Sequence, residues 1–168
     1  ETTYQSVGKL LARCVAITGC EHFGLLAGQR ATPSAFGVAG FMLQNSPDVG
    51  TALRDFAQHL GLHDQGGVVV LQTLGHISLV GYAIQLPDVE AADQIYDLSI
   101  AIGCNFMRSM CGESWNPDEV LLTRPPPQDI APLSQFFRAP LHFNAVQNAL
   151  VFPTKWLNHH VPGADALL

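Results

Sequence analysis

Apolar and polar residues separate most clearly, at helical spacing, between Asp88 and Cys111. Polar or small residues recur there every three or four positions, at Glu90, Gln94, Asp97, Ala101, Asn105 and Arg108. We expect this stripe to face solvent. A second, apolar stripe consists of Ile95, Leu98, Ile102, Phe106 and Met110. Further apolar residues widen the second stripe, so the pattern predicts a long helix that begins at Asp88, ends before Gly112 and is buried on more than one side.

The chain before this segment is mostly helical in pattern. Apolar spacing predicts an amphipathic helix from Tyr4 to Thr18, ended by glycine, and a second helix that begins at Ser46 and Pro47 and runs to Gly61. Between them lies a segment rich in glycine, with Gly24, Gly28, Gly37 and Gly40. Because the segment lacks both common phosphate-loop motifs, we interpret these glycines as positions of close helix packing.

Before and after the long helix, apolar residues recur with a period of two, which is typical of strands. Runs rich in β-branched residues predict a hairpin of Val68–Thr73 and Ile77–Gln85, a short strand at Val120–Thr123 and a last strand at Asn148–Phe152. Asp129–Phe137 is predicted to form a short helix, and Leu141–Phe143 an extended piece. We therefore expect an α+β fold: an N-terminal helical part and a small, mostly antiparallel sheet of about four strands, packed by the long helix. Residues 1–168 are expected to form a single domain.

Charged residues make up only 13% of the chain, against 48% apolar residues. So low a charged share indicates that part of the surface is covered by a partner. The net charge of -6 and the scattered Lys and Arg residues argue against a DNA-binding surface on this chain. No apolar run is long enough to cross a bilayer and no signal-peptide pattern opens the sequence, so we expect a cytoplasmic protein without membrane contact.

Catalytic and metal-binding motifs are weak. His59 and His63 have the separation of helical metal ligands, but Gly61 is expected to end the helix between them, and no third ligand is evident. Cys104 and Cys111 share the apolar face of the long helix, where burial makes a thiol unreactive. We expect four reduced cysteines, no metal, no cofactor and no enzymatic activity.

A small-molecule cavity has more support. Adaptable sulfur-containing residues cluster late in the long helix, and Tyr82 shares a strand face with Ser78, which would place a polar tip in apolar surroundings. Taken alone, the same residues favour ordinary core, because such stripes usually pack against other side chains. The candidate ligand-binding residues are Phe41, Ser78, Tyr82, Cys104, Met107 and Cys111.

The C-terminal stretch QFFRAPLHFNAVQNALVFPTKWLNHHVPGAD carries a distinctive pattern. It closely resembles the end of the arabinose-binding-like N-terminal domain of AraC-type transcriptional regulators. The residues that match are Phe137, Pro140, Leu141, Phe143, Ala145, Asn148, Leu150, Phe152, Leu157, Val161, Pro162 and Asp165. Three earlier segments, FGLLAG, FGVAGF and SPDVGTAL, also resemble motifs of this family, in the same order.

The resemblance implies a bacterial domain that binds a small effector of unknown identity and forms a homodimer. It assigns DNA contacts to a C-terminal domain of two helix-turn-helix units, which these 168 residues do not include. The resemblance does not identify arabinose as the ligand. The alternative is a pure oligomerisation module without a small-molecule ligand.

Overall fold

The computed structural model describes residues 3–63 and 66–164, with the backbone alone for residues 61–63. The helices are α1 (Tyr4–Thr18), α2 (Phe23–Gln29), α3 (Gly37–Asn45), α4 (Val49–His63), α5 (Ala92–Cys111) and α6 (Ala131–Phe137). Two short 3-10 helices are η1 (Pro33–Phe36) and η2 (Thr154–Asn158). The strands are β1 (Gly67–Leu74), β2 (Ile77–Ile84), β3 (Glu119–Leu121), β4 (Leu141–His142) and β5 (Asn148–Pro153).

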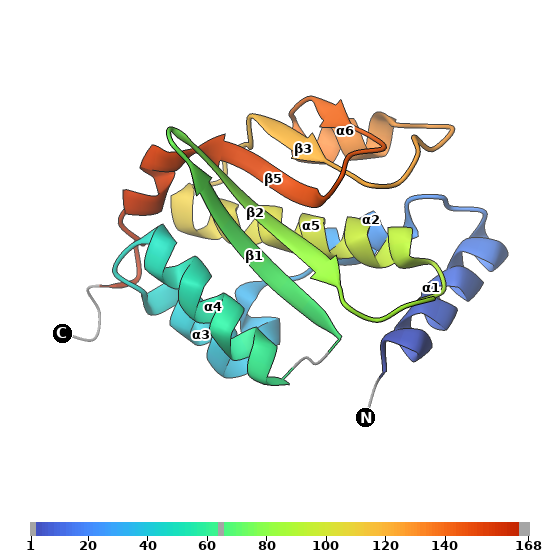
Figure 1. Ribbon diagram of the computed structural model, residues 1–168, viewed down its shortest axis with the longest axis horizontal. Helices are drawn as coiled ribbons and strands as arrows, with labels where there is room; N and C mark the ends of the chain where they lie inside the picture. Colours follow the sequence, from blue (N-terminus) through green and yellow to red (C-terminus); the bar gives the residue numbers. More distant parts are fainter. Residues whose placement is uncertain (1–2, 64–65, 165–168) are drawn as a thin grey trace.

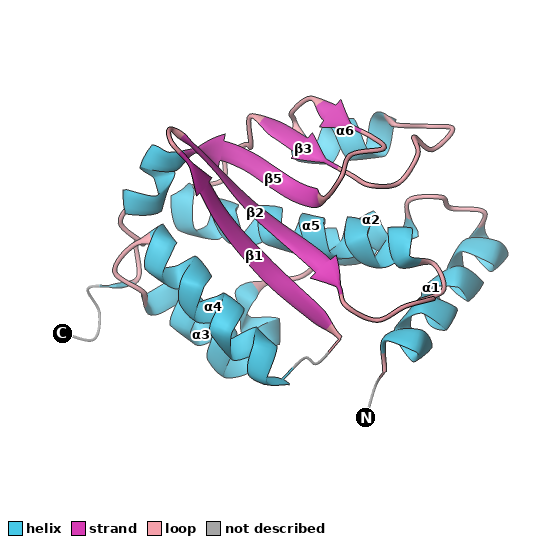
Figure 2. Ribbon diagram, in the orientation of Figure 1, coloured by secondary structure: helices cyan, strands magenta, loops and turns pink. Residues whose placement is uncertain are grey.

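Within the described residues the strands form one five-stranded sheet in the order β1-β2-β5-β3-β4 (Figure 2). All neighbours are antiparallel except β3 and β4, which pair in parallel. The strand beyond the four expected is β4, which corresponds to the extended piece predicted at Leu141–Phe143, and only two of its residues join the sheet. The predicted α+β fold with a small, mostly antiparallel sheet is confirmed.

The sheet and α5 form the centre of the molecule. Helix α5 crosses one face of the sheet, in contact with β2 and β5, while α4 packs beside it against β1 (Figure 1). On the other side of α5 lie α2 and α1. The long helix is therefore buried between the sheet and a helical layer, on more than one side as predicted.

Two helices begin later than predicted. Helix α5 starts at Ala92, because Asp88 and Ala91 have positive φ angles of 53° and 49° and lie in a turn. Helix α4 starts at Val49, because the backbone N–H of Thr51 donates to the carboxylate of Asp48 at 2.7 Å and makes Asp48 the capping residue. Gly61 does not end α4, which continues to His63.

The polar stripe of α5 does not face solvent, so that prediction was wrong. Gln94 is 4% exposed, and Asp97 and Ala101 are fully buried. The stripe packs against α2 and the loop after β3. Close packing by glycine is confirmed at Gly24 and Gly28: a Cβ at Gly24 would collide with the carbonyl oxygen of Gln94, and one at Gly28 would lie 2.5 Å from that of Leu98. That interpretation is wrong for Gly37, where a Cβ would meet nothing within 4 Å.

No single helix among the described residues has both the length and the apolarity needed to cross a bilayer. Helices α1 and α2 meet those criteria only as a pair, and a bend of 112° separates them.

Candidate functional site: an apolar cavity beneath the sheet

A cavity of about 430 Å³ lies where α5, α4 and the sheet meet. Its wall is built from α1, η1, α4, β1, β2, α5 and β5. The volume falls in the range of about 300 to 1,000 Å³ that is typical of small-molecule sites. The cavity is thus large enough for a metabolite and is formed by elements from most of the chain.

Strand register and helix periodicity together determine the lining. Val69 pairs with Tyr82 and Val80 pairs with Leu150, so these four side chains share the face of the sheet that looks at α5. From α5, four members of the predicted apolar stripe line the cavity: Ile95, Leu98, Ile102 and Phe106. The alternating strand pattern and the helical stripe therefore face each other across the space.

Three phenylalanines form a rigid part of the wall. The rings of Phe36, Phe56 and Phe106 meet edge to face, with centroids 5.2 to 5.8 Å apart. Edge-to-face packing of this kind stabilises a cluster beyond its buried area. The cluster presents a preformed aromatic surface to whatever occupies the cavity.

The few polar side chains in the lining are hydroxyls. The hydroxyl groups of Tyr4 and Tyr82 are hydrogen-bonded to each other, which joins the first turn of α1 to β2. Ser99 donates its hydroxyl proton to the carbonyl oxygen of Ile95 at 2.8 Å. A Cβ at Gly67 would collide with the Tyr82 hydroxyl, so the glycine at the start of β1 leaves the room that the tyrosine pair needs.

The six predicted ligand-binding residues lie in different places. Tyr82 lines the cavity. Ser78 lies on the same face of β2 but is buried between the hydroxyls of Thr73 and Thr154. Neither Ser78 nor the remaining four line the cavity: Cys104 and Met107 are fully buried in the core, Cys111 is half-buried beside it, and Phe41 is 56% exposed on α3. Ligand contact through these residues stays a prediction.

Sequence reasoning missed the small residues of α5 that open the cavity. Ser99 and Gly103 are one helical turn apart and lie among the apolar residues of the lining. At Gly103 a Cβ would meet only Leu150, at 3.7 Å. Two small residues at four-residue spacing inside an apolar stripe would have been the pattern to look for.

Cys104 and Cys111 have the properties of inert core thiols, whereas Cys14 and Cys20 are half-buried outside the core. Burial raises the pKa of Cys104 to about 11 and that of Cys111 to about 12. All four cysteines of the chain are free thiols. Among the side chains that the structure describes, those of residues 3–60 and 66–164, no three from His, Cys, Asp or Glu are grouped in a way that could hold a metal ion.

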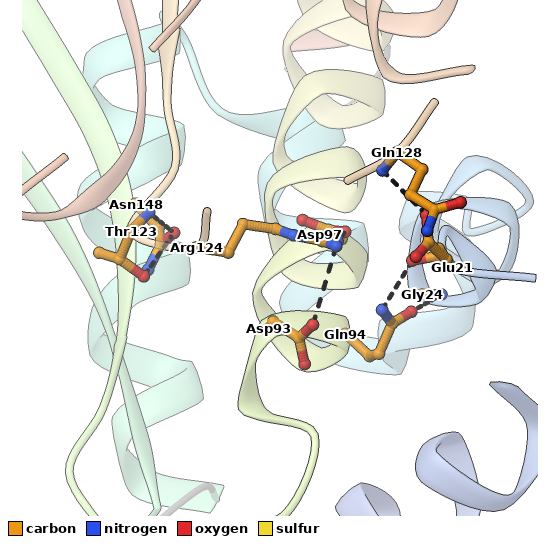
Figure 3. A network of polar contacts seen from close by, with 9 residues as sticks. All are labelled: Glu21, Gly24, Asp93, Gln94, Asp97, Thr123, Arg124, Gln128 and Asn148. Carbon is orange, nitrogen blue, oxygen red and sulfur yellow. Dashed lines mark hydrogen bonds and ion pairs between the residues drawn. The ribbon is translucent and has the colours of Figure 1, made fainter. Parts of the chain in front are cut away.

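A network of polar contacts occupies the other stripe of α5 (Figure 3). Arg124, from the loop after β3, forms a short ion pair with the buried Asp97 and lies 3.8 Å from Asp93. Burial raises the pKa of Asp97 from 3.8 to about 6, and the Arg124 charge opposes that shift. One oxygen of Asp97 and Nε of Arg124 have no hydrogen-bond partner among the described residues. Charge is therefore concentrated on the stripe that does not line the cavity.

Comparison with known proteins places this architecture in a family. The family model described as the arabinose-binding domain of AraC transcription regulators, N-terminal, matches residues 1–161. A similar solved structure is that of the transcriptional regulator CdpR from Pseudomonas aeruginosa, with a TM-score of 0.76 and 19% identity. The match covers 94% of this chain and 51% of the CdpR chain, and at that identity it shows a shared fold alone. No curated protein matches. The chain belongs to the family of N-terminal arabinose-binding domains of AraC transcription regulators.

Proposed function

We propose that this domain binds a small effector in the cavity beneath the sheet and acts as the sensing part of a bacterial AraC-type regulator, without catalysing a reaction. The observation that carries the proposal is the cavity of about 430 Å³ with its preformed aromatic wall. An ordinary core would close such a space, because unfilled volume costs packing energy.

Sensing requires that the effector favour one of two states of the regulator. A ligand that binds both states equally shifts no equilibrium. We propose that the effector changes the arrangement of a homodimer and thereby the placement of DNA-binding parts that lie outside these residues. The net charge of -6 supports assigning the DNA contacts elsewhere.

The test is a metabolite screen by thermal shift, followed by calorimetry, on the wild-type chain and on Gly103→Leu. A true effector at about 100 times its dissociation constant raises the free energy of unfolding by about 2.7 kcal/mol. The leucine occupies cavity volume and should abolish that gain. Ala16→Leu, at an exposed position of α1, adds the same side chain away from the cavity and serves as the matched control. If no metabolite binds saturably, the sensing proposal is wrong.

A second candidate function, oligomerisation without a ligand, has its own support. Large apolar side chains are exposed in pairs on two helices: Leu10 and Ile17 on α1, at 62% and 75%, and Val38 and Phe41 on α3, at 72% and 56%. Such clusters favour a protein interface.

Light scattering tests the dimer that both functions require, and the metabolite screen separates them, because only a sensing domain binds an effector. We expect a mass about twice the 18.1 kDa of the chain. Replacing Leu10 and Ile17, or Val38 and Phe41, by serine should dissociate the dimer if that pair lies in the interface, whereas Gly103→Leu should leave the dimer intact. A monomeric wild-type chain would contradict dimerisation.

A further inference from the structure

We infer that the cavity takes an uncharged, largely apolar molecule that carries one or two hydrogen-bonding groups. This inference rests on the proposed function of the cavity as a binding site, and it narrows the chemical class of the effector. It follows from what the lining holds, from the hydroxyl groups within it and from the position of the nearby charges.

The described part of the lining offers no partner for a charged ligand. Among the described residues that line the cavity there is no Lys, Arg, His, Asp or Glu. A carboxylate or ammonium group moved from water into an apolar space without an opposite charge loses several kcal/mol of solvation that nothing there replaces. Amino acids, organic acids and phosphate esters are therefore unsuitable occupants.

Charges on α5 do not change that conclusion. Asp97 and Arg124 are paired with each other, and neither lines the cavity. The Arg108 guanidinium donates to the carbonyl oxygens of Trp115 and Phe136 and stacks 4.9 Å from the centre of the Phe136 ring. Arg108, the one cation of α5, is thus engaged with other parts of the fold, and Arg124 is engaged with Asp97.

The hydroxyl groups of the lining limit how polar the ligand can be. The side-chain hydroxyls that line the cavity in the described part of the chain are those of Tyr4, Tyr82 and Ser99. Ser99 has given its proton to Ile95, so toward a ligand it acts as an acceptor. A hydroxyl, phenol or amide N–H on the ligand would suit it. A free sugar would bury more hydroxyls than this lining can pair, and each unpaired one costs free energy.

The size and wall of the cavity agree with this class. A space of about 430 Å³ has room for many water molecules. So many waters would find few polar partners among Phe36, Phe56 and Phe106, and their replacement by apolar groups is favourable. An aromatic or branched aliphatic molecule would contact those rings directly.

The experiment uses N-phenyl-1-naphthylamine, an uncharged fluorophore with one N–H group, as the probe. We expect saturable binding with one probe per chain. Decan-1-ol, decanoate and decylammonium then compete for the site at pH 7.5 below their micelle concentrations, so that the competitors differ only in their head groups. Decan-1-ol should displace the probe at a concentration at least about tenfold lower than either charged competitor.

Three variants and one control test whether the probe binds in the cavity. Gly103→Leu should weaken probe binding by at least about tenfold, and Ala16→Leu should leave it unchanged. Should Gly103→Leu fail to fold, Gly103→Ala provides a milder test, since its methyl group has space and should weaken binding by about two- to threefold. Ser99→Ala should weaken the binding of decan-1-ol more than that of the probe.

The outcomes separate this inference from the proposed function. One outcome is that decanoate or decylammonium displaces the probe as effectively as decan-1-ol does, with the effect lost in Gly103→Leu. That result would overturn the inference that the ligand is uncharged, but it would leave the cavity as a binding site. Failure of the probe to bind overturns the inference as well. The proposed function then stands only if the metabolite screen yields a polar effector whose binding is lost in Gly103→Leu. If Ala16→Leu weakens probe binding as much as Gly103→Leu, the probe binds elsewhere and the inference is wrong.

Discussion

Gly103 and Gly81 both contribute to the cavity wall, but a side chain would meet different surroundings at the two positions. At Gly103, inside α5, the nearest atom to an added Cβ is a methyl carbon of Leu150 at 3.7 Å. At Gly81, in β2, an added Cβ would lie 2.6 Å from the carbonyl oxygen of Asn148 on the neighbouring strand. The first glycine leaves space open, whereas the second lets two strands approach.

This contrast predicts opposite effects of the same substitution. Gly103→Ala should raise the free energy of unfolding by up to about 1 kcal/mol, because alanine is favoured over glycine within a helix and its methyl group fits. Gly81→Ala should lower it, because the strands must separate to admit the methyl group. Urea denaturation of the two variants beside the wild type measures both effects, and a loss of stability in Gly103→Ala would show that the helix has no such space.

Asp97 should make the stability of the fold decrease as the pH rises, which is the opposite of the usual effect of a carboxylate. Its pKa is raised from 3.8 to about 6 mainly by burial, so the folded chain holds this proton more tightly than the unfolded chain does. The contribution of Asp97 to stability is therefore greatest below about pH 4 and falls as the pH rises through about 6. The fall between about pH 5 and pH 7 should be on the order of 1 kcal/mol.

Asp97→Asn tests that dependence. Asparagine keeps the size of the side chain and an oxygen that can accept from Arg124, but it does not titrate. Between pH 5 and pH 7 the free energy of unfolding, measured by urea denaturation, should fall by this amount more in the wild type than in the variant. Equal pH dependence in the two proteins would mean that Asp97 is ionised throughout, with Arg124 outweighing burial.

At the scale of elements, the polar stripe of α5 holds the short helix α2 at both ends. Gln94 accepts from the backbone N–H of Gly24 at 2.9 Å and donates to the carbonyl oxygen of Glu21 at 2.8 Å. Further along α5, Asn105 donates to the carbonyl oxygens of Gly28 and Gln29. Two side chains thus satisfy backbone groups that a seven-residue helix leaves unpaired at its termini.

Replacement of Gln94 by leucine should therefore lower the free energy of unfolding more than a substitution at an exposed position does. The backbone N–H of Gly24 would be left buried without a partner, which costs about 1 to 3 kcal/mol. Gln58→Leu, at an exposed position of α4, is the matched control and should change stability little. Thermal denaturation of both variants gives the comparison, and equal melting temperatures would argue against the role of Gln94.

These contacts explain which elements the sequence could predict. The bounds of α1 agree with the prediction because its apolar face and its ending glycine are local features. The polar stripe of α5 was misread because a glutamine that faces water and one that bonds to a neighbouring helix give the same pattern. What distinguishes them is Gly24 and Gly28, about seventy residues earlier, whose missing side chains bring α2 into reach.

The site was predictable only in part, for a similar reason. Tyr82 and the apolar stripe of α5 follow from periodicity, and both line the cavity. Cys104 and Met107 are as apolar as the lining residues, yet they fill the core beside it. Whether an apolar side chain borders space or protein depends on all the elements packed around it, and no local pattern contains that information.

On the scale of the whole molecule, the cavity joins α1 to α4, two helices that have few direct contacts with each other. Tyr4 and Val7 reach it from the first turns of α1, and Leu60 reaches it from late in α4. Helices α2 and α6, in contrast, contribute nothing to the lining among the described residues. A molecule bound in the cavity would therefore connect α1, α4 and the sheet without touching α2 or α6.

Hydrogen exchange with and without saturating N-phenyl-1-naphthylamine tests this arrangement. We expect slower exchange in the first turns of α1, in α4 and in β1 and β2, since the probe supplies contacts that local opening of those elements would break. Exchange in α2 and α6 should change little beyond any uniform effect of global stabilisation. The Gly103→Leu chain gives the background, since its filled cavity should remove the local effect. Protection centred on α2 or α6 would place the binding site outside the cavity, and protection confined to one lining element would mean that the bound molecule does not connect them.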